Sequence, residues 1–344
     1  MSDRVTDLTL AEQASLTSGG TAWTTTAVRD VVRSLHLSDG PHGLRRAQDE
    51  SLLSAGVPAT CFPPAVTSGS TWDPALVRRM GTALAREASA LGVDVILGPG
   101  INIKRSPLCG RNFEYFSEDP HVSGVMGAAL VEGIQSLGVG ACVKHFAVNN
   151  QETDRMRVSA DVDERTLREL YLSAFEHVVR EAGPYTVMAS YNRINGVYAC
   201  ENLWLLTQVL RQEWGFDGLV MSDWGAVDDR AAALAAGLDL QMPPDGTDRQ
   251  VVAAVEDGRL DRAAVTAAAT RVLQLRERVD RAQRFDDWDV DAHHELAREA
   301  ARAGAVLLKN DGGLLPLDPA AHLTVAVIGE FARTPATRAT AAPE

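Results

Sequence analysis

The sequence contains no long hydrophobic run. Among its 344 residues, no stretch approaches the roughly eighteen consecutive apolar residues that a membrane-spanning helix needs. The N-terminal stretch MSDRVTDLTLAEQASLTSGG also lacks the apolar core of about seven or more residues that marks a signal peptide. We therefore expect a cytoplasmic protein with no membrane partner.

Cysteine is scarce, and positive charge is in deficit. The four cysteines form no C-x-x-C pair; they are Cys61, Cys109, Cys142 and Cys200. This spacing favours free, partly buried thiols over a zinc site or a disulfide framework. The net charge of −13 argues against nucleic acid as a partner, because phosphate binding needs a basic face. Neutral or cationic small molecules fit this charge better.

One pattern recurs through the middle of the chain. A glycine leads into a short apolar run and then into polar residues at 91–100, 137–146, 182–192, 215–224 and 236–245. Such continuous apolar runs are typical of strands buried on both faces, as in a parallel sheet. Helical patterns stand between them at 123–135, 163–181, 203–214 and 227–236. This alternation predicts βα units and a (β/α)₈ TIM-type barrel, with a doubly wound sheet as the alternative.

In both folds, functional groups lie at the carboxyl ends of the strands. The residues at these ends, or in glycine- and proline-containing loops near them, are Asp39, Arg45, Arg111, Lys144, His145, Tyr191, Asp223 and Trp224. Such groups suit a sugar, because charged side chains hydrogen-bond its hydroxyls and an indole covers its apolar face. A carboxylate beneath the anomeric carbon can act as a nucleophile, while a second carboxyl protonates the leaving oxygen.

Several of these residues also have a purely structural interpretation. Asp223 would serve as the N-cap of the helix expected to begin near Val227. Lys144 and His145 would be hydrogen-bonded residues on the barrel rim without a functional role. Arg111 would pair with Glu114 or Glu118 across a loop. The residues alone leave these alternatives open.

The last part of the chain changes character. Residues 248–284 are alanine-rich with a helical pattern, and 286–304 suggest a linker followed by a helix. Two strand-like runs, AGAVLLKN and LTVAVIGE, then open a second α/β pattern, which ends in ARTPATRATAAPE. That last segment consists of small and polar residues, and it has no large apolar side chains that could pack into a core. We therefore expect a barrel over 1–285 and an incomplete second domain over 305–344, whose strands would be exposed edges.

Seven motifs occur in an order typical of one family. They are SDGPHGLR, CFPPAVTSGSTWDPAL, LGPGINIKRSPLCGRNFEYFSEDP, VKHFAVNNQETDR, VMASYNRINGVYACENLWLL, GFDGLVMSDWGAV and AVLLKNDGGLLPL. With them the chain resembles the β-glucosidase branch of glycoside hydrolase family 3 over nearly its whole length. The resemblance implies an N-terminal (β/α)₈ barrel and the truncated start of an α/β sandwich domain. It also implies retaining hydrolysis of terminal nonreducing β-D-glucosyl residues without a metal or other cofactor.

The resemblance assigns roles to the site residues. Asp223 of VMSDW matches the nucleophile. The residues that match positions holding the nonreducing sugar are Asp39, Arg45, Arg111, Lys144, His145 and Tyr191, and Trp224 would line the same pocket. The expected partner is a β-glucoside or a short oligosaccharide, and a homo-oligomer is left open.

The acid/base is expected outside this stretch of sequence. In the β-glucosidase branch it is a glutamate of the second domain, and Glu114 and Glu152 are the weak alternatives here. Loss of general acid catalysis would slow the reaction by about 10²–10⁴-fold. VKHFAVNNQETDR has no second histidine, which places the chain outside the N-acetylglucosaminidase branch. β-Xylosidase specificity and a catalytically impaired sugar-binding fragment remain as alternatives.

Overall fold

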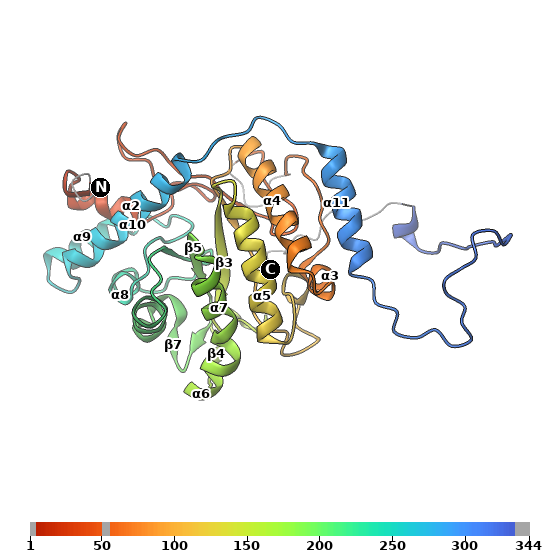
Figure 1. The fold of residues 1–344 in the computed structure, drawn as a ribbon. Coiled ribbons are helices and arrows are strands. Elements are labelled where there is room, and N and C mark those ends of the chain that lie inside the picture. The colour runs from red at the N-terminus through yellow and green to blue at the C-terminus, as the bar shows by residue number, and fades with distance from the viewer. Residues whose placement is uncertain (1–4, 50–55, 334–344) are drawn as a thin grey trace.

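A parallel sheet forms the centre of the molecule (Figure 1). The computed structural model describes residues 5–49 and 56–333. Five strands pair in the order β1-β2-β3-β5-β8, all of them parallel. Their bounds are Leu37–Asp39, Val95–Leu97, Gly140–Phe146, Thr186–Ala189 and Leu219–Ser222. A separate small sheet joins β4 (Ser159–Ala160), β6 (Arg193–Ile194) and β7 (Val197–Tyr198).

Irregular backbone pairing closes the large sheet into a ring. Beyond β8, Met221 bridges Leu240 in parallel, and Gln241 in turn bridges Ser18 in parallel. The segment 19–25 then doubles back on itself and pairs with His36, which leads directly into β1. The predicted α/β barrel is therefore confirmed, with irregular segments where an ideal (β/α)₈ barrel would have regular strands.

Helices surround this ring. Along the chain they are α2 (Leu10–Leu16), α3 (Ala65–Ser70), α4 (Pro74–Ala90), α5 (Pro120–Gln135), α6 (Glu164–Thr166), the π-helical turn Leu167–Leu172, α7 (Ser173–Ala182), the π-helix Trp204–Glu213, α8 (Arg230–Ala236), α9 (Asp248–Glu256), α10 (Arg262–Asp280) and α11 (Val290–Ala303). Figure 1 shows α4, α5 and α7 side by side over β3 and β5. No helix in the described ranges is long and apolar enough to span a bilayer.

Local chemistry sets where these helices begin and end. Asp73 caps α4 by accepting from the Leu76 N–H at 3.0 Å, and proline follows it at the first helical position. Gly183 and Gly237 end α7 and α8 in the left-handed conformation, with φ of 52° and 107°. These glycines are the ones that lead into the apolar runs at 182–192 and 236–245.

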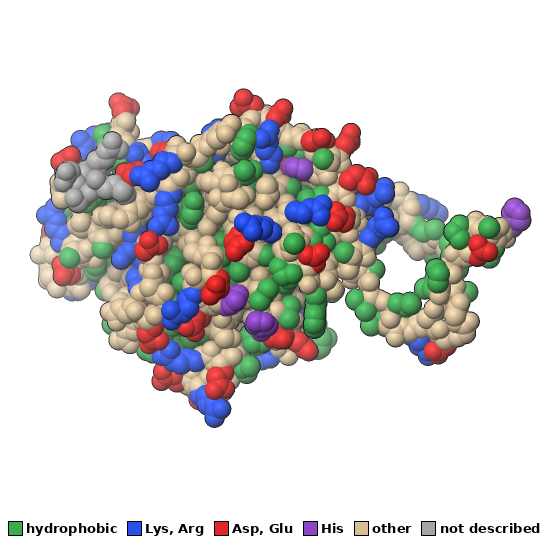
Figure 2. Space-filling view, viewed as in Figure 1, with side chains coloured by type: hydrophobic (Ala, Val, Ile, Leu, Met, Phe, Trp, Pro, Cys, Tyr) green, Lys and Arg blue, Asp and Glu red, His purple; other side chains and the backbone are tan. Residues whose placement is uncertain are grey.

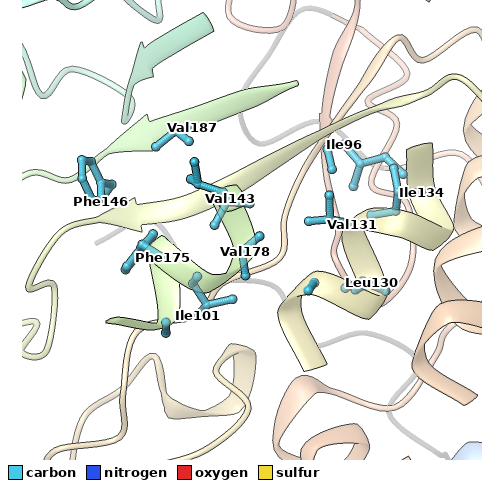
Figure 3. Close-up of a cluster of buried hydrophobic side chains, with 14 of the residues drawn as sticks. Ile96, Ile101, Leu130, Val131, Ile134, Val143, Phe146, Phe175, Val178 and Val187 are labelled. Carbon is cyan, nitrogen blue, oxygen red and sulfur yellow. The ribbon is translucent and has the colours of Figure 1, made fainter. Parts of the chain in front are cut away.

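Both faces of the strands are buried. Alternate strand residues face the barrel interior; they are Val95, Leu97, Cys142, Met188, Leu219 and Met221. The residues between them meet the surrounding helices, as Figure 3 shows for Ile96, Val143 and Val187 against Val131, Ile134, Phe175 and Val178. Because both faces of each strand are buried, the strand sequences are continuous apolar runs.

The predicted strands after residue 304 are not present. Within residues 305–333 the structure has no strand, and the segment runs away from the body with its apolar side chains exposed (Figures 1 and 2). Leu308 and Ile328 are 91% and 90% exposed. A run of β-forming residues needs a neighbouring strand to satisfy its backbone, and no described segment pairs with this one. The remainder of the predicted second domain, 334–344, lies outside the described residues.

Helix α11 was predicted and packs on the barrel. Its His293 lies 2.6 Å from the buried carboxylate of Glu87 in α4. Glu299 of α11 pairs with Arg79 of α4 at 2.7 Å. These contacts attach the predicted linker-and-helix region to the barrel. The division of the chain into domains at 285 and 304 stays a prediction.

Candidate active site

The predicted site residues converge at one end of the barrel. Asp39 is the last residue of β1, and Asp223 directly follows β8. Lys144 and His145 lie among the last three residues of β3, and Tyr191 follows β5 by two residues. Parallel strands all point the same way, so their carboxyl ends open onto one mouth.

The two carboxylate oxygens of Asp223 have different surroundings within the described residues. Its backbone N–H donates to the Ala189 carbonyl at 2.9 Å, which continues the pairing of β5 with β8. Oδ1 accepts the Trp224 N–H at 2.8 Å. Among the described residues Oδ2 has no hydrogen-bond partner, and it faces Nε2 of His145 at 3.6 Å. The helix-cap interpretation is wrong, because α8 begins later and Asp229 caps it.

Positive charge surrounds this buried carboxylate. Burial raises the pKa of Asp223, and the charges of Arg111 and Lys144 oppose that rise. An isolated buried carboxylate would be strongly destabilised, so the two cations offset part of the cost of burying it.

Four charged side chains form an alternating chain across the mouth. The Arg111 guanidinium donates to one oxygen of Glu114, whose other oxygen lies 3.7 Å from Nζ of Lys144. Lys144 also donates to Oδ1 of Asp39 at 3.1 Å. Burial acts against both charges of this last pair, yet the partners prevail, so the pKa of Lys144 is raised and that of Asp39 is lowered. The Arg111–Glu114 pair proposed from sequence is confirmed as part of this chain.

His145 is held through both its backbone and its ring. The Asn102 side chain accepts the His145 N–H at 2.7 Å and donates to the His145 carbonyl at 2.9 Å. The ring places Nε2 at 2.8 Å from Arg111 and Nδ1 at 3.0 Å from the Tyr115 hydroxyl. Burial, followed by the charges of Arg111 and Lys144, lowers the pKa of His145 far below its ordinary value. The imidazole is therefore neutral, and its approach to the nearby carboxylate is not an ion pair.

Tyr191 lies between the carboxylate and a loop arginine. The Arg155 guanidinium stands over the Tyr191 ring, 4.9 Å from its centre, and bonds Glu152 at 2.8 Å. Burial and the Asp223 carboxylate raise the pKa of Tyr191 well above its ordinary value, so its hydroxyl stays protonated. The tyrosine is thus available as a hydrogen-bond donor beside the carboxylate.

Two predicted residues join the site at its margin. Trp224 donates from Nε1 to the Ala22 carbonyl at 2.9 Å and packs against Trp23, with ring centres 5.7 Å apart. Arg45 is connected through its backbone, whose N–H donates to the Asp39 carbonyl at 2.9 Å. The structure therefore brings the predicted residues together, with Arg45 linked through the main chain.

Sequence reasoning did not assign site roles to three residues that hold this arrangement. They are Asn102, Tyr115 and Arg155. All three lie inside two of the quoted motifs, LGPGINIKRSPLCGRNFEYFSEDP and VKHFAVNNQETDR, so the motifs carried the only signal for them. Over the described ranges, no three His, Cys, Asp or Glu side chains converge so as to hold a metal ion.

The fold and the site together define a class: an α/β barrel with a charged ligand site at the carboxyl ends of its strands. The family model for the glycosyl hydrolase family 3 N-terminal domain matches residues 47–275. The chain belongs to glycosyl hydrolase family 3.

Curated relatives agree with this assignment. The chain is 53% identical to an exo-alpha-(1->6)-L-arabinopyranosidase of Bifidobacterium longum, over 96% of this chain and 46% of that protein. It is 49% identical to thermostable beta-glucosidase B of Acetivibrio thermocellus, over 96% of this chain and 44% of that one. The chain thus spans about half the length of the curated relatives that it matches.

Solved structures are similarly close. A crystal structure of a family 3 beta-glucosidase from Bifidobacterium adolescentis superposes with a TM-score of 0.91 at 53% identity, over 96% of this chain and 48% of that one. Beta-glucosidase 3B from Thermotoga neapolitana, solved in complex with glucose, superposes with a TM-score of 0.87 at 39% identity, over 92% and 48% respectively. These structures support the assignment of the barrel.

Proposed function

We propose that the protein contributes the sugar-binding barrel of a retaining β-glucosidase, with Asp223 as its nucleophile. One observation carries the proposal: Oδ2 of Asp223 is buried at the mouth, close to fixed cations, without a hydrogen-bond partner among the described residues. A carboxylate oxygen in this position is available to attack. The beta-glucosidase names of several relatives support the substrate class.

The reaction has two displacements. In the first, Oδ2 of Asp223 bonds to the anomeric carbon as the glycosidic bond breaks, and a general acid protonates the leaving oxygen. In the second, water attacks the same carbon, gives its proton to the conjugate base, and releases Asp223 as a carboxylate. Two inversions leave the β configuration unchanged.

The neighbouring charges hold the sugar in this account. The Asp39 carboxylate accepts hydrogen bonds from sugar hydroxyls. Lys144 and Arg111 donate hydrogen bonds to other hydroxyls. Tyr191 donates to the Asp223 carboxylate before the first displacement and after the second. Because these groups are already bonded to one another, little reorganisation accompanies binding.

The acid/base is a separate requirement. Glu114 is held between Arg111 and Lys144, and one oxygen of Glu152 is bonded to Arg155, so both carboxyls are already engaged with cations. We therefore assign this role to a glutamate outside the described residues, in line with the family resemblance.

A pentopyranosidase is the second candidate. It is favoured by the 53% identity to a relative named as an exo-alpha-(1->6)-L-arabinopyranosidase. A glucopyranoside carries a hydroxymethyl group on C5 and a pentopyranoside does not. The two specificities therefore differ in the protein groups that face C5 of the sugar. The predicted cytoplasmic location and homo-oligomer remain proposals.

Comparison of activated substrates tests the function. We would measure kcat/KM for the 2,4-dinitrophenyl derivatives of β-glucose, β-xylose and α-L-arabinopyranose, because this leaving group needs little protonation. The expected result is the highest value for the glucoside, with the β-anomer as the first product by ¹H NMR, and loss of turnover in Asp223→Ala. Asp229→Ala, a helix-cap substitution six positions along, is the matched control. An α-anomer as the first product would contradict a retaining mechanism, and glucose binding without turnover would support the sugar-binding fragment.

A further inference from the structure

A chain of buried side-chain hydrogen bonds leads away from the site through Tyr115. Nη2 of Arg111 lies 2.8 Å from Nε2 of His145, and Nδ1 of the same ring lies 3.0 Å from the Tyr115 hydroxyl. Asn149 extends the chain, since its Nδ2 donates to that hydroxyl at 3.3 Å. Tyr115 is fully buried, and His145 is 1% exposed. The mechanism above gives Tyr115 and Asn149 no role.

The partners determine which ring nitrogen of His145 carries the proton. A guanidinium has donors and no acceptor, so Nε2 must accept from Arg111. The single proton of the neutral ring is then on Nδ1 and is donated to the Tyr115 oxygen. The low pKa of His145 and the raised pKa of Tyr115, both caused first by burial, keep this pair a neutral imidazole and a neutral phenol.

This tautomer bears directly on Asp223. Nε2 of His145 faces Oδ2 of Asp223 at 3.6 Å, and without a proton it offers that oxygen no hydrogen bond. In the opposite tautomer the single ring N–H would be on Nε2, where it would point toward Oδ2, and Nε2 could no longer accept from Arg111. That N–H would tie up the attacking oxygen and push the guanidinium away. The arrangement seen here keeps the oxygen free.

We propose that Tyr115 is a positioning residue: by accepting Nδ1–H of His145, its hydroxyl keeps Nε2 as an acceptor, which holds Arg111 in place and leaves Oδ2 of Asp223 free to attack. The proposal rests on Asp223 as the nucleophile of the proposed function. Tyr115 itself does not touch the substrate. It acts through His145 and Arg111.

Histidine ¹⁵N spectra test the tautomer without any substrate. Ring nitrogens with and without a proton have different ¹⁵N shifts, and the His145 signals are assigned by their loss in His145→Gln. The wild-type protein should show protonated Nδ1 and bare Nε2 at neutral pH, and protonated Nε2 would overturn the proposal. Tyr115→Phe, which removes only the hydroxyl, should shift population toward protonated Nε2. Tyr171→Phe is the matched control, because its hydroxyl accepts from Arg105 at the surface.

The rate of nucleophile labelling is the second readout. The substrate is 2,4-dinitrophenyl 2-deoxy-2-fluoro-β-glucoside, and the glycosyl-enzyme is counted by intact mass. Loss of one buried acceptor predicts labelling that is slower by about 10- to 100-fold in Tyr115→Phe and unchanged in Tyr171→Phe. A wild-type rate in Tyr115→Phe, or slower labelling with an unchanged tautomer, would overturn the proposal. If the wild-type protein takes no label at all, the proposed function fails, while the tautomer measurement still stands on its own.

Discussion

The Lys144 ammonium lies 3.1 Å from the Asp39 carboxylate, although the two residues are 105 positions apart in the chain. They come from β1 and β3, and β2 lies between those strands. The barrel therefore sets this distance, and the ion pair forms before any sugar arrives. A site built in this way binds hydroxyls with groups that are already oriented.

Asp39→Asn tests that pair. Lys144 keeps Glu114 as a second partner, so we expect a loss of about 1–3 kcal/mol in the free energy of unfolding instead of the larger cost of a stranded charge. Protection by glucose against thermal unfolding should also disappear. Urea unfolding and thermal melts measure the two effects. Asp154→Asn, which breaks an exposed pair with Arg157, should change neither.

A second buried carboxylate stabilises the barrel beneath β8. Asp239 is fully buried, bonds Arg211 at 2.5 Å and Arg271 at 2.8 Å, and accepts the Val220 N–H at 2.8 Å. Asp239→Ala would leave two partly buried arginines without their partner, and we expect a loss of about 3–5 kcal/mol in unfolding free energy. A loss below about 1 kcal/mol in urea unfolding would show that this network is not what holds the strand.

The matched control for that substitution is Asp217→Ala. Its carboxylate is 78% exposed and pairs with Arg278 at 2.9 Å. Exposed pairs contribute little, so the change should stay within about 0.5 kcal/mol.

His36 makes the fold sensitive to acid. Burial, and then the charge of Arg46, lower the pKa of His36 from 6.5 to about 4. The unfolded chain therefore binds a proton at a higher pH than the folded chain does. The contribution of His36 is complete above pH 6.5, falls as the pH drops toward 4, and changes no further below that value.

The variant His36→Gln should show a shallower loss of stability between pH 6.5 and 4. We expect a difference of about 1–2 kcal/mol across that window, allowing for the partial exposure of the ring. Urea midpoints at several pH values measure it. Parallel curves for the two proteins would mean that other groups cause the acid sensitivity.

A chain that ends at residue 304 tests the predicted start of the second domain. The described residues after that point expose large apolar side chains and form no strand, so their removal should leave the urea midpoint unchanged. It should also reduce self-association in light scattering, because exposed apolar segments promote aggregation. A lower midpoint would show that residues beyond 304 support the barrel.

Local pattern explains most of what could be predicted from the sequence. The strand cores, the glycines that end helices and the strand-end positions of Lys144 and Asp223 all follow from hydrophobic period and turn chemistry. The ring closure through 17–25 could not be predicted, because it depends on pairing between distant, irregular segments. Tyr115 was missed for the same reason, since only the folded loop brings it to His145. The prediction of strands after residue 304 was wrong, because residues with strand propensity form a sheet only where a partner strand is present.

Covalent trapping at Asp223 tests the central claim most directly. The protein would be incubated with 2,4-dinitrophenyl 2-deoxy-2-fluoro-β-glucoside, digested, and its labelled peptide sequenced by mass spectrometry. The account predicts one fluoroglucosyl group on the carboxylate of Asp223, with no label in Asp223→Ala. A label on another residue, or no label on a chain shown to be folded by circular dichroism, would contradict it.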